Sequence, residues 1–282
     1  SQMTSVELLK LVDPSLYYSK FIAGGVFPDG RAIDAFKPFS FKRGVVGGVC
    51  AGSALVRQGG VTVVCTLSAS LSPLNTESMM TIEWEGATTD EADLKMALVD
   101  ARTLVDELIT REAFFTRKAL RSNDERLEWR LNAKFRLLHW DGDLSAAVVG
   151  GLLAALSDAR LPKVLLKHAE DDEAPIDPME ISIEKNESKW SPIELSSNPV
   201  ASTFILYVDE QATMHLLADP PVDARRLCRS QCTIVIGKKE EQKPSILALR
   251  SSGSCSDELL QRMVGIAEKR QESIVKALEK RE

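Results

Sequence analysis

The stretch RLEWRLNAKFRLLHWDGDLSAAVVGGLLAALS, residues 126–157, carries two hydrophobic periods in succession. From residue 126 to residue 137 polar and apolar side chains alternate, which is typical of a strand with one buried face. A turn at residues 141–143 follows, and residues 145–157 are then apolar on almost every side, as in a helix buried on most of its surface. The stretch therefore predicts a half-buried strand of an antiparallel or mixed sheet that leads through a tight turn into a core helix.

Helical patterns precede this stretch. Apolar residues over 4–23 predict short helices on either side of a break at Pro14. Apolar residues at helical spacing over 94–108 predict the clearest helix of the chain, with Thr88 and Glu91 as its capping box.

Strand patterns fill much of the remaining chain. Two β-rich runs, 53–57 and 61–69, flank a Gly-Gly pair and predict a hairpin. Ser256 can cap a last long helix, whose charged tail beyond Glu268 is expected to fray. Further strands are predicted at 202–208, 213–218, 231–236 and 245–250. This order, without an interdomain linker, predicts an α+β fold in which helices lie against sheets.

Composition narrows the classes of function. The chain has 282 residues, of which 44% are hydrophobic and 27% charged, as is ordinary for a globular protein that buries a sizeable core. Its net charge of −6 argues against a polycation, so any contact with RNA must come from a local basic patch. An acidic run over 170–187 is expected to be a solvated loop between strands.

Cysteine use indicates a reducing compartment, the cytosol or the nucleus. Five cysteines, an odd and scattered number, argue against a disulfide framework. Cys228 and Cys232 lack a second ligand pair, so we expect buried thiols rather than a zinc site, and no metal or other cofactor. We expect no membrane association, because the N-terminus lacks a signal pattern and the apolar stretch 144–156 is too short to span a bilayer.

Common catalytic motifs are absent from the sequence. There is no Walker loop, Rossmann fingerprint, nucleophile elbow or HExxH motif. Gly47-Gly48 is expected to serve a turn and Gly150-Gly151 close helix packing, rather than a phosphate cradle. Periodicity and composition therefore leave the function open.

A series of short motifs runs through most of the chain. It includes the strand–Asp-Gly–helix unit of 126–157 together with Tyr17-Tyr18 with Phe21, Pro28-Asp29-Gly30-Arg31, Gly52-Ser53-Ala54-Leu55-Val56 and Asn198-Pro199-Val200-Ala201. In this order the motifs resemble the RNase PH family, and within it the non-catalytic ring subunits of the eukaryotic RNA exosome. The segment 73–89 departs from the family pattern. The resemblance implies an RNase PH-like fold (ribosomal protein S5 domain 2-like), with mixed sheets packed with helices. It also implies a single domain over 1–282, with an N-terminal extension over 1–27 and a C-terminal helix at about 256–282.

The resemblance further implies that a phosphorolytic site has lost its chemistry. Active members hold phosphate at a Gly-Gly-Thr-Arg turn, through an arginine and helix N-terminal amides. Here Leu144 offers no hydrogen bond, Ser145 carries no charge, and Asp143 would repel phosphate by about 4 kcal/mol at ~4 Å and an effective dielectric of ~20. The catalytic aspartate of active members aligns with Gln231, which cannot act as an acid. Leu144, Ser145 and Gln231 are thus degenerate positions, and no catalytic residue is predicted.

Three arginines are the candidates for contact with RNA. By the resemblance, Arg225, Arg226 and Arg229 lie where the lost site would face the central channel of the ring, and could hold phosphates of a threading strand. They could instead pair with acids of a neighbouring subunit or line a solvated loop. The basic side of the strand 126–136 is a weaker candidate, because Glu128 interrupts it.

The expected function is that of a structural subunit that guides RNA. By the resemblance, its partners are other RNase PH-like chains in a hetero-hexameric ring, S1/KH-type cap proteins, a separate catalytic nuclease and single-stranded RNA. The expected process is 3′-to-5′ RNA processing and degradation, including that of ribosomal RNA, in the nucleus, nucleolus and cytoplasm. Two alternatives stay open: an active phosphate-dependent 3′ exoribonuclease that uses Asp219 or Asp223, and a self-standing RNA-binding protein.

Overall fold

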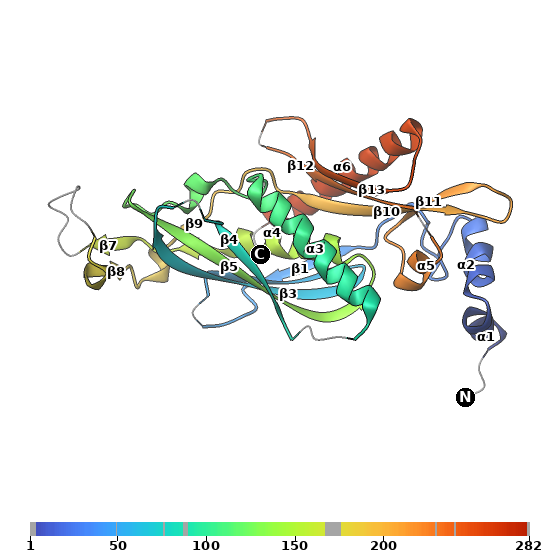
Figure 1. The fold of residues 1–282 in the computed structure, drawn as a ribbon, viewed down its shortest axis with the longest axis horizontal. Coiled ribbons are helices and arrows are strands. Elements are labelled where there is room, and N and C mark those ends of the chain that lie inside the picture. The colour runs from blue at the N-terminus through green and yellow to red at the C-terminus, as the bar shows by residue number, and fades with distance from the viewer. Residues whose placement is uncertain are drawn as a thin grey trace.

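Two sheets with helices between and behind them form the body of the molecule (Figure 1). The computed structural model describes residues 4–48, 50–75, 77–86, 90–166, 176–228, 230–239 and 241–280. Among these residues, none of the helices is both long enough and apolar enough to cross a membrane.

The first sheet is five-stranded, in the order β1-β2-β3-β5-β4. Its strands β2 and β3 form the predicted antiparallel hairpin, which turns at Gly59 with a φ of 57° that glycine adopts readily. The long strand β5 pairs antiparallel with β3 and parallel with β4, so the sheet is mixed. The bounds are β1 Phe39–Arg43, β2 Gly52–Gln58, β3 Gly60–Pro73, β4 Met80–Glu85 and β5 Leu127–Asp141.

Helices α3 (Ala92–Thr110) and α4 (Leu144–Asp158) lie against each other beside this sheet, and α4 also contacts β10 of the second sheet. Almost every residue of α4 is buried, as its apolar sequence predicts. A Cβ atom on Gly150 would lie 2.7 Å from the ring of Phe39, and one on Gly151 would lie 3.2 Å from Val63. The Gly-Gly pair therefore serves close packing, which confirms the interpretation from sequence.

The second sheet is four-stranded, in the order β11-β10-β12-β13, and α6 covers the face opposite to α4. Ser256 caps α6, because its Oγ accepts a hydrogen bond from the Leu259 N–H at 3.3 Å. The expectation that α6 frays beyond Glu268 is wrong: the helix continues to Glu279, because Ile274 and Leu278 are buried in the core beneath the first sheet. The bounds are β10 Val200–Val208, β11 Met214–Ala218, β12 Ser230–Gly237, β13 Ser245–Ser252, α5 Val222–Arg226 and α6 Asp257–Glu279.

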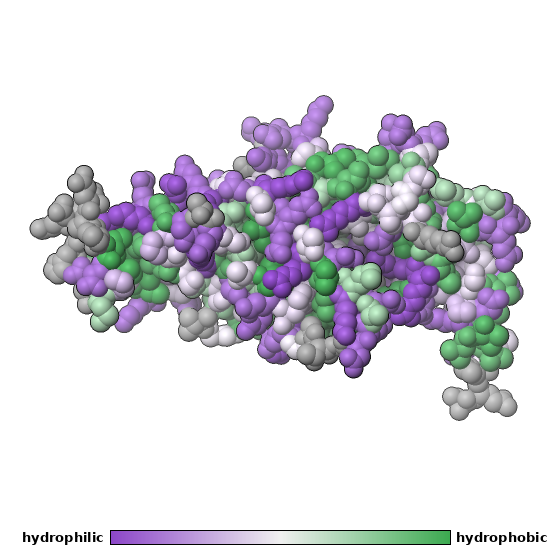
Figure 2. Space-filling model, in the orientation of Figure 1, coloured by the Kyte–Doolittle hydropathy of each residue, from purple (hydrophilic) through white to green (hydrophobic). Residues whose placement is uncertain are grey.

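The N-terminal helices break at Pro14 as predicted, into α1 (Ser5–Val12) and α2 (Pro14–Ala23). Tyr18 and Ile22 of α2 are buried against the second sheet. Helix α1 has no buried residue, and Figure 2 shows its apolar surface standing out from the body of the molecule. The exposed apolar side chains of α1 are Val6, Leu8, Leu11 and Val12.

Short elements complete the fold. They are β6 Arg160–Leu161, β7 Val164–Leu166, β8 Ile181–Ile183, β9 Ser191–Pro192 and the 3-10 helices η1 Arg117–Leu120, η2 Pro178–Glu180 and η3 Glu187–Lys189. Strand β7 pairs with β8, which lies inside the acidic run 170–187, so the described part of this run is not simply a loop between strands as expected. Residues 170–175 of the run lie outside the described part of the chain.

Two local predictions are wrong. The N-cap of α3 is Glu91, whose side chain makes no capping hydrogen bond, so the predicted capping box does not begin the helix, and Thr88 itself lies outside the described residues. Glu128 is not on an exposed polar face of β5 but is buried, because the side chain of Arg117 lies over it. For Glu128, a tertiary contact decides what the local pattern leaves open.

Candidate functional site

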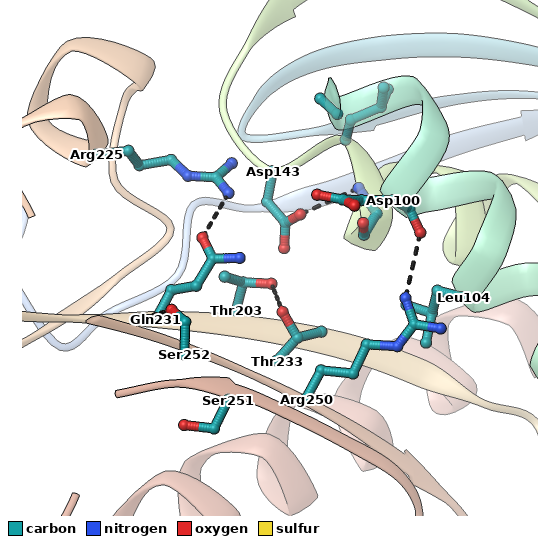
Figure 3. Close-up of a pocket in the computed structure, with 13 residues that line it drawn as sticks. Asp100, Leu104, Asp143, Thr203, Arg225, Gln231, Thr233, Arg250, Ser251 and Ser252 are labelled. Atoms are coloured by element: carbon teal, nitrogen blue, oxygen red, sulfur yellow. Dashed lines mark hydrogen bonds between the residues drawn. The ribbon is translucent and has the colours of Figure 1, made fainter. Parts of the chain in front are cut away.

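A pocket of about 230 Å³ opens where the second sheet meets α3 and the N-terminus of α4 (Figure 3). Three parts of the chain that are distant in sequence supply its walls. The lining residues are Ala97, Asp100 and Leu104 from α3, Asp143, Leu144 and Ser145 at the start of α4, and Thr203, Arg225, Gln231, Thr233, Arg250, Ser251 and Ser252 from the region of the second sheet.

The register of the second sheet builds the polar floor of this pocket. Thr203 of β10 lies opposite Thr233 of β12, which lies opposite Arg250 of β13, so the three side chains form one row. The two threonine hydroxyls are hydrogen-bonded to each other at 2.8 Å. Gln231 is paired with Ser252, whose Oγ accepts the Gln231 backbone N–H at 3.1 Å. The floor therefore offers hydroxyl and amide groups rather than a carboxylate.

A carboxylate stands instead at the start of α4. Asp143 is the N-cap, and its Oδ1 accepts the Ser145 backbone N–H at 3.0 Å. Its side chain is nearly closed off from solvent, with 5% exposed, and its Oδ2 has no hydrogen-bond partner among the described residues. A helix N-terminus attracts anions through its free N–H groups and its dipole. Here the chain supplies that anion itself.

Both arginines of the pocket are already engaged. Arg225 donates to the Gly142 carbonyl and to the Gln231 Oε1, each at 3.1 Å, and so joins the turn before α4 to strand β12. Arg250 donates to the Asp100 carbonyl at 3.4 Å and to the Glu107 carboxylate at 2.9 Å. Their guanidinium groups fix the walls of the pocket to one another.

Comparison with known proteins identifies the fold. Residues 35–162 match the model of the 3′ exoribonuclease family, RNase PH domain 1. A chain of an archaeal exosome core superimposes with a TM-score of 0.67 at 20% identity, over 96% of this chain and 99% of that one. This is an RNase PH-like fold. The predicted fold class, and the resemblance to the RNase PH family as far as the fold, are confirmed.

Two further solved structures are similar to the chain. An Archaeoglobus fulgidus exosome with RNA bound to the active site gives a TM-score of 0.68 at 16% identity, over 95% of this chain and 99% of that one. Rrp46 from rice (Oryza sativa) gives 0.58 at 13% identity, over 89% of this chain and 96% of that one. The RNase PH family match spans β1 to α4 and includes Asp143, Leu144 and Ser145, whereas Arg225 and Gln231 lie beyond it.

The structure brings together most of the residues that the sequence singles out. Leu144, Ser145, Gln231 and Arg225 all line the one pocket of this RNase PH-like fold. Arg226 does not: it forms ion pairs with Asp93 at 2.7 Å and with Glu91 at 3.2 Å, beside the start of α3, and with Asp223 at 3.6 Å. Arg229 lies outside the described residues.

Neither aspartate of the exoribonuclease alternative is among the described residues that line the pocket. Asp219 is 3% exposed, and its Oδ2 accepts the Lys37 N–H at 3.2 Å and the Gln58 side-chain amide at 3.4 Å. Burial, reinforced by the charge of Asp143, raises the pKa of Asp219. Asp223 is half exposed and pairs with Lys10 and Arg226 at 3.6 Å.

A half-buried arginine whose charge acts on Asp143 was missed from the sequence. Arg270 of α6 donates to the Ala201 carbonyl and to the Gln58 Oε1, each at 2.6 Å. Burial lowers the pKa of Arg270 to about 10, although the charges of Asp219 and Asp143 oppose the shift. Its position gives the signal that could have found it, because it lies seven residues after Met263 on the buried side of the helix.

The arginines on the basic side of β5 are paired within the chain. Glu128 accepts two hydrogen bonds from Arg117, at 2.6 and 3.0 Å. The other ion pairs join Arg126 to Asp124, Arg130 to Glu77 and Arg136 to Glu85. Arg117, Glu77 and Glu85 thus tie β5 to η1 and to the segment 73–89, which departs from the family motifs.

Proposed function

We propose that this chain is a non-catalytic structural subunit of a eukaryotic RNA exosome ring, of the type of ribosomal RNA-processing protein 43. The single observation that carries this proposal is the carboxylate of Asp143 at the N-terminus of α4. Active members of the resembled family hold phosphate at this turn. A phosphate anion would meet a buried like charge there, and like charges about 4 Å apart repel by about 4 kcal/mol at an effective dielectric of ~20.

The rest of the pocket supports the loss of phosphorolysis. Gln231, at the position aligned with the catalytic aspartate, has its amide oxygen held by Arg225 and cannot exchange protons as a carboxylic acid does. Leu144 is 1% exposed and adds an apolar side chain. The exoribonuclease alternative relies on Asp219 or Asp223, but both have partners elsewhere. The acids that line the pocket are Asp143 and Asp100 instead.

The proposed role in a ring rests on the fold and on an exposed apolar surface. Two of the similar structures are exosomes, and a ring of different chains requires each subunit to bury two distinct faces. Helix α1 exposes Val6, Leu8, Leu11 and Val12, and exposed apolar groups of this kind mark protein contacts. The further proposed partners are S1/KH-type cap proteins and a separate catalytic nuclease. The proposed sites of action are the nucleus, nucleolus and cytoplasm.

The RNA-guiding part of the proposal rests on Arg225. Its guanidinium lines the pocket, whereas that of Arg226 is held by acids of the same chain. A phosphate contact of this kind binds RNA without reading its sequence. Reversing the charge of Arg225, Arg226 and Arg229 together in the assembled ring should weaken RNA binding and flatten its salt dependence. Arg262→Glu on α6 is the control. If the triple variant binds RNA as well as the wild type does, the proposal that this chain guides RNA is contradicted.

The ring itself is tested by native mass spectrometry of the complex purified through this chain. We expect one copy of the chain with several paralogues of similar size, held in fixed stoichiometry. A chain that purifies as a monomer and binds RNA alone would support the self-standing RNA-binding alternative and contradict the ring.

A further inference from the structure

Asp143 keeps one carboxylate oxygen without a partner. Its Oδ1 caps α4, but Oδ2 accepts no hydrogen bond from any described residue, in a side chain of which only 5% is exposed. Figure 3 shows the carboxylate directed into the pocket, toward the space between Gln231, Thr203 and Thr233. A buried oxygen of this kind is normally satisfied by a protein group, a water molecule or a ligand.

The two arginines of the pocket donate to acceptors other than Oδ2. Arg225 donates to Gly142 and Gln231, and Arg250 donates to Asp100 and Glu107, so both guanidinium groups of the pocket are turned to other acceptors. The hydroxyls of Thr203 and Thr233 are bonded to each other. Oδ2 therefore faces a polar space in which the chain's own cations are committed elsewhere.

The charges around Oδ2 favour a cation over an anion. Asp143 and Asp100 line the pocket, Arg225 adds one positive charge that only neutral groups accept from, and Arg250 is neutralised by Glu107 at 2.9 Å. The positive charge of Arg270, which is half-buried, acts on both Asp143 and Asp219, so it balances two carboxylates rather than one. A group that carries a positive charge and N–H donors gains from contact with Oδ2, whereas a phosphate placed against Oδ2 is repelled.

We propose that the pocket binds a small ligand through a protonated amine or a guanidinium group, which donates to the Oδ2 of Asp143. The volume of about 230 Å³ admits a compact cationic head group. In active members of the resembled family the amides at this helix N-terminus hold an anion. In this chain Asp143 caps those amides and would itself hold a cation. This inference is independent of the ring role.

Calorimetric titration of the purified full-length chain tests the proposal, with agmatine as the probe. Agmatine carries a primary amine at one end and a guanidinium at the other, and separate titrations with butylamine and methylguanidinium distinguish the two groups. Inorganic phosphate is the anionic arm. We expect saturable binding of agmatine and none of phosphate. Absence of agmatine binding, or binding of phosphate that competes with it, would overturn the proposal.

The substitution Asp143→Asn locates the site. Asparagine is as good an N-cap as aspartate, so the variant keeps the helix start but removes the charge. We expect agmatine to bind at least about tenfold more weakly, since hydrogen bonds to charged groups are the stronger kind. Asp13→Asn is the matched control, because Asp13 caps α2 away from the pocket, with its Oδ1 on the Leu16 N–H at 3.0 Å. Equal affinity of agmatine for wild type and Asp143→Asn would overturn the proposal. The preference for agmatine over phosphate is measured on the wild-type chain, so it does not depend on whether a variant folds.

Discussion

At the scale of single residues, Asp143 and Gln231 set the chemistry of the pocket. Asp143 occupies the helix N-terminus with its own charge, and Gln231 offers an amide that Arg225 already holds. The resemblance to the RNase PH family marks both positions in the sequence, one in the turn before α4 and the other in β12. It does not say that Oδ2 stays unpaired, which depends on strands more than 50 residues away.

Adjacent residues on a short helix illustrate the limit of sequence reasoning. Arg225 and Arg226 point about 100° apart on α5, so only one of them can face the pocket. The basic run 225–229 gives no means of choosing between them. The acids at the start of α3, far away in sequence, attract Arg226 and leave Arg225 at the pocket.

Glu128 provides a prediction at this scale. Its buried carboxylate takes two hydrogen bonds from Arg117, which lower the pKa of Glu128. We expect Glu128→Gln to reduce the free energy of unfolding at pH 7 by about 2 kcal/mol, as for other hydrogen bonds between charged groups. The measurement is urea unfolding, and Glu83→Gln on the exposed side of β4 should change little.

The same pair predicts a direction with pH. A lowered pKa means that the folded protein binds this proton less tightly than the unfolded chain does. The stability that Glu128 contributes is therefore present above its ordinary pKa of about 4.3, and it is lost as the pH falls through the folded-state value. The difference between wild type and Glu128→Gln should shrink as the pH falls below about 4. A difference that stays constant with pH would contradict the ionic origin of the effect.

At the scale of elements, periodicity predicts which face of a strand or helix is buried, but not how the elements pack against one another. The alternation over β5, the apolar α4 and the hairpin β2–β3 are confirmed, because each has one period throughout. The expected fraying of α6 is wrong because the residues that stop it, Ile274 and Leu278, are buried by a sheet distant in sequence.

Helix α6 carries a matched pair of arginines for a test at this scale. Arg270 is half-buried and joins α6 to Ala201 and Gln58, whereas Arg262 forms an exposed ion pair with Asp34. Removing one partner of a buried charge cluster leaves uncompensated charges, so Arg270→Ala should cost about 3 kcal/mol of unfolding free energy. Arg262→Ala should cost about 0.5 kcal/mol or less. Equal losses in thermal or urea unfolding would contradict the buried network.

The junction of β3 with the end of β5 permits a second test. A Cβ on Gly60 would lie 1.9 Å from the Asp141 carbonyl oxygen, which is backbone and cannot rotate away, whereas one on Gly47 would meet nothing within 4 Å. We expect Gly60→Ala to destabilise the protein by about 2 kcal/mol or more, and Gly47→Ala to leave it nearly unchanged. Asp141 directly precedes Gly142 and the pocket. The Gly60→Ala variant should therefore also lower the affinity for any ligand that binds at Asp143.

At the scale of the whole molecule, the pocket forms where α3 and the start of α4 meet the second sheet, so no single layer creates it. The fold class follows from the order of elements and from family motifs, and the structure confirms it. The buried cluster of Arg270, Asp219 and Asp143 could not be predicted from the sequence. Its members come from three segments that only the tertiary fold brings together.

The most direct test of the proposed function is phosphorolysis. The purified chain, alone and in its native complex, is incubated with short single-stranded RNA and inorganic phosphate, and nucleoside diphosphates are measured by chromatography. We predict no diphosphates from the isolated chain, and no change in the complex when Asp219 and Asp223 are replaced by alanine. Diphosphate release by the isolated chain that these substitutions abolish would contradict a non-catalytic subunit and show that the chain is an enzyme.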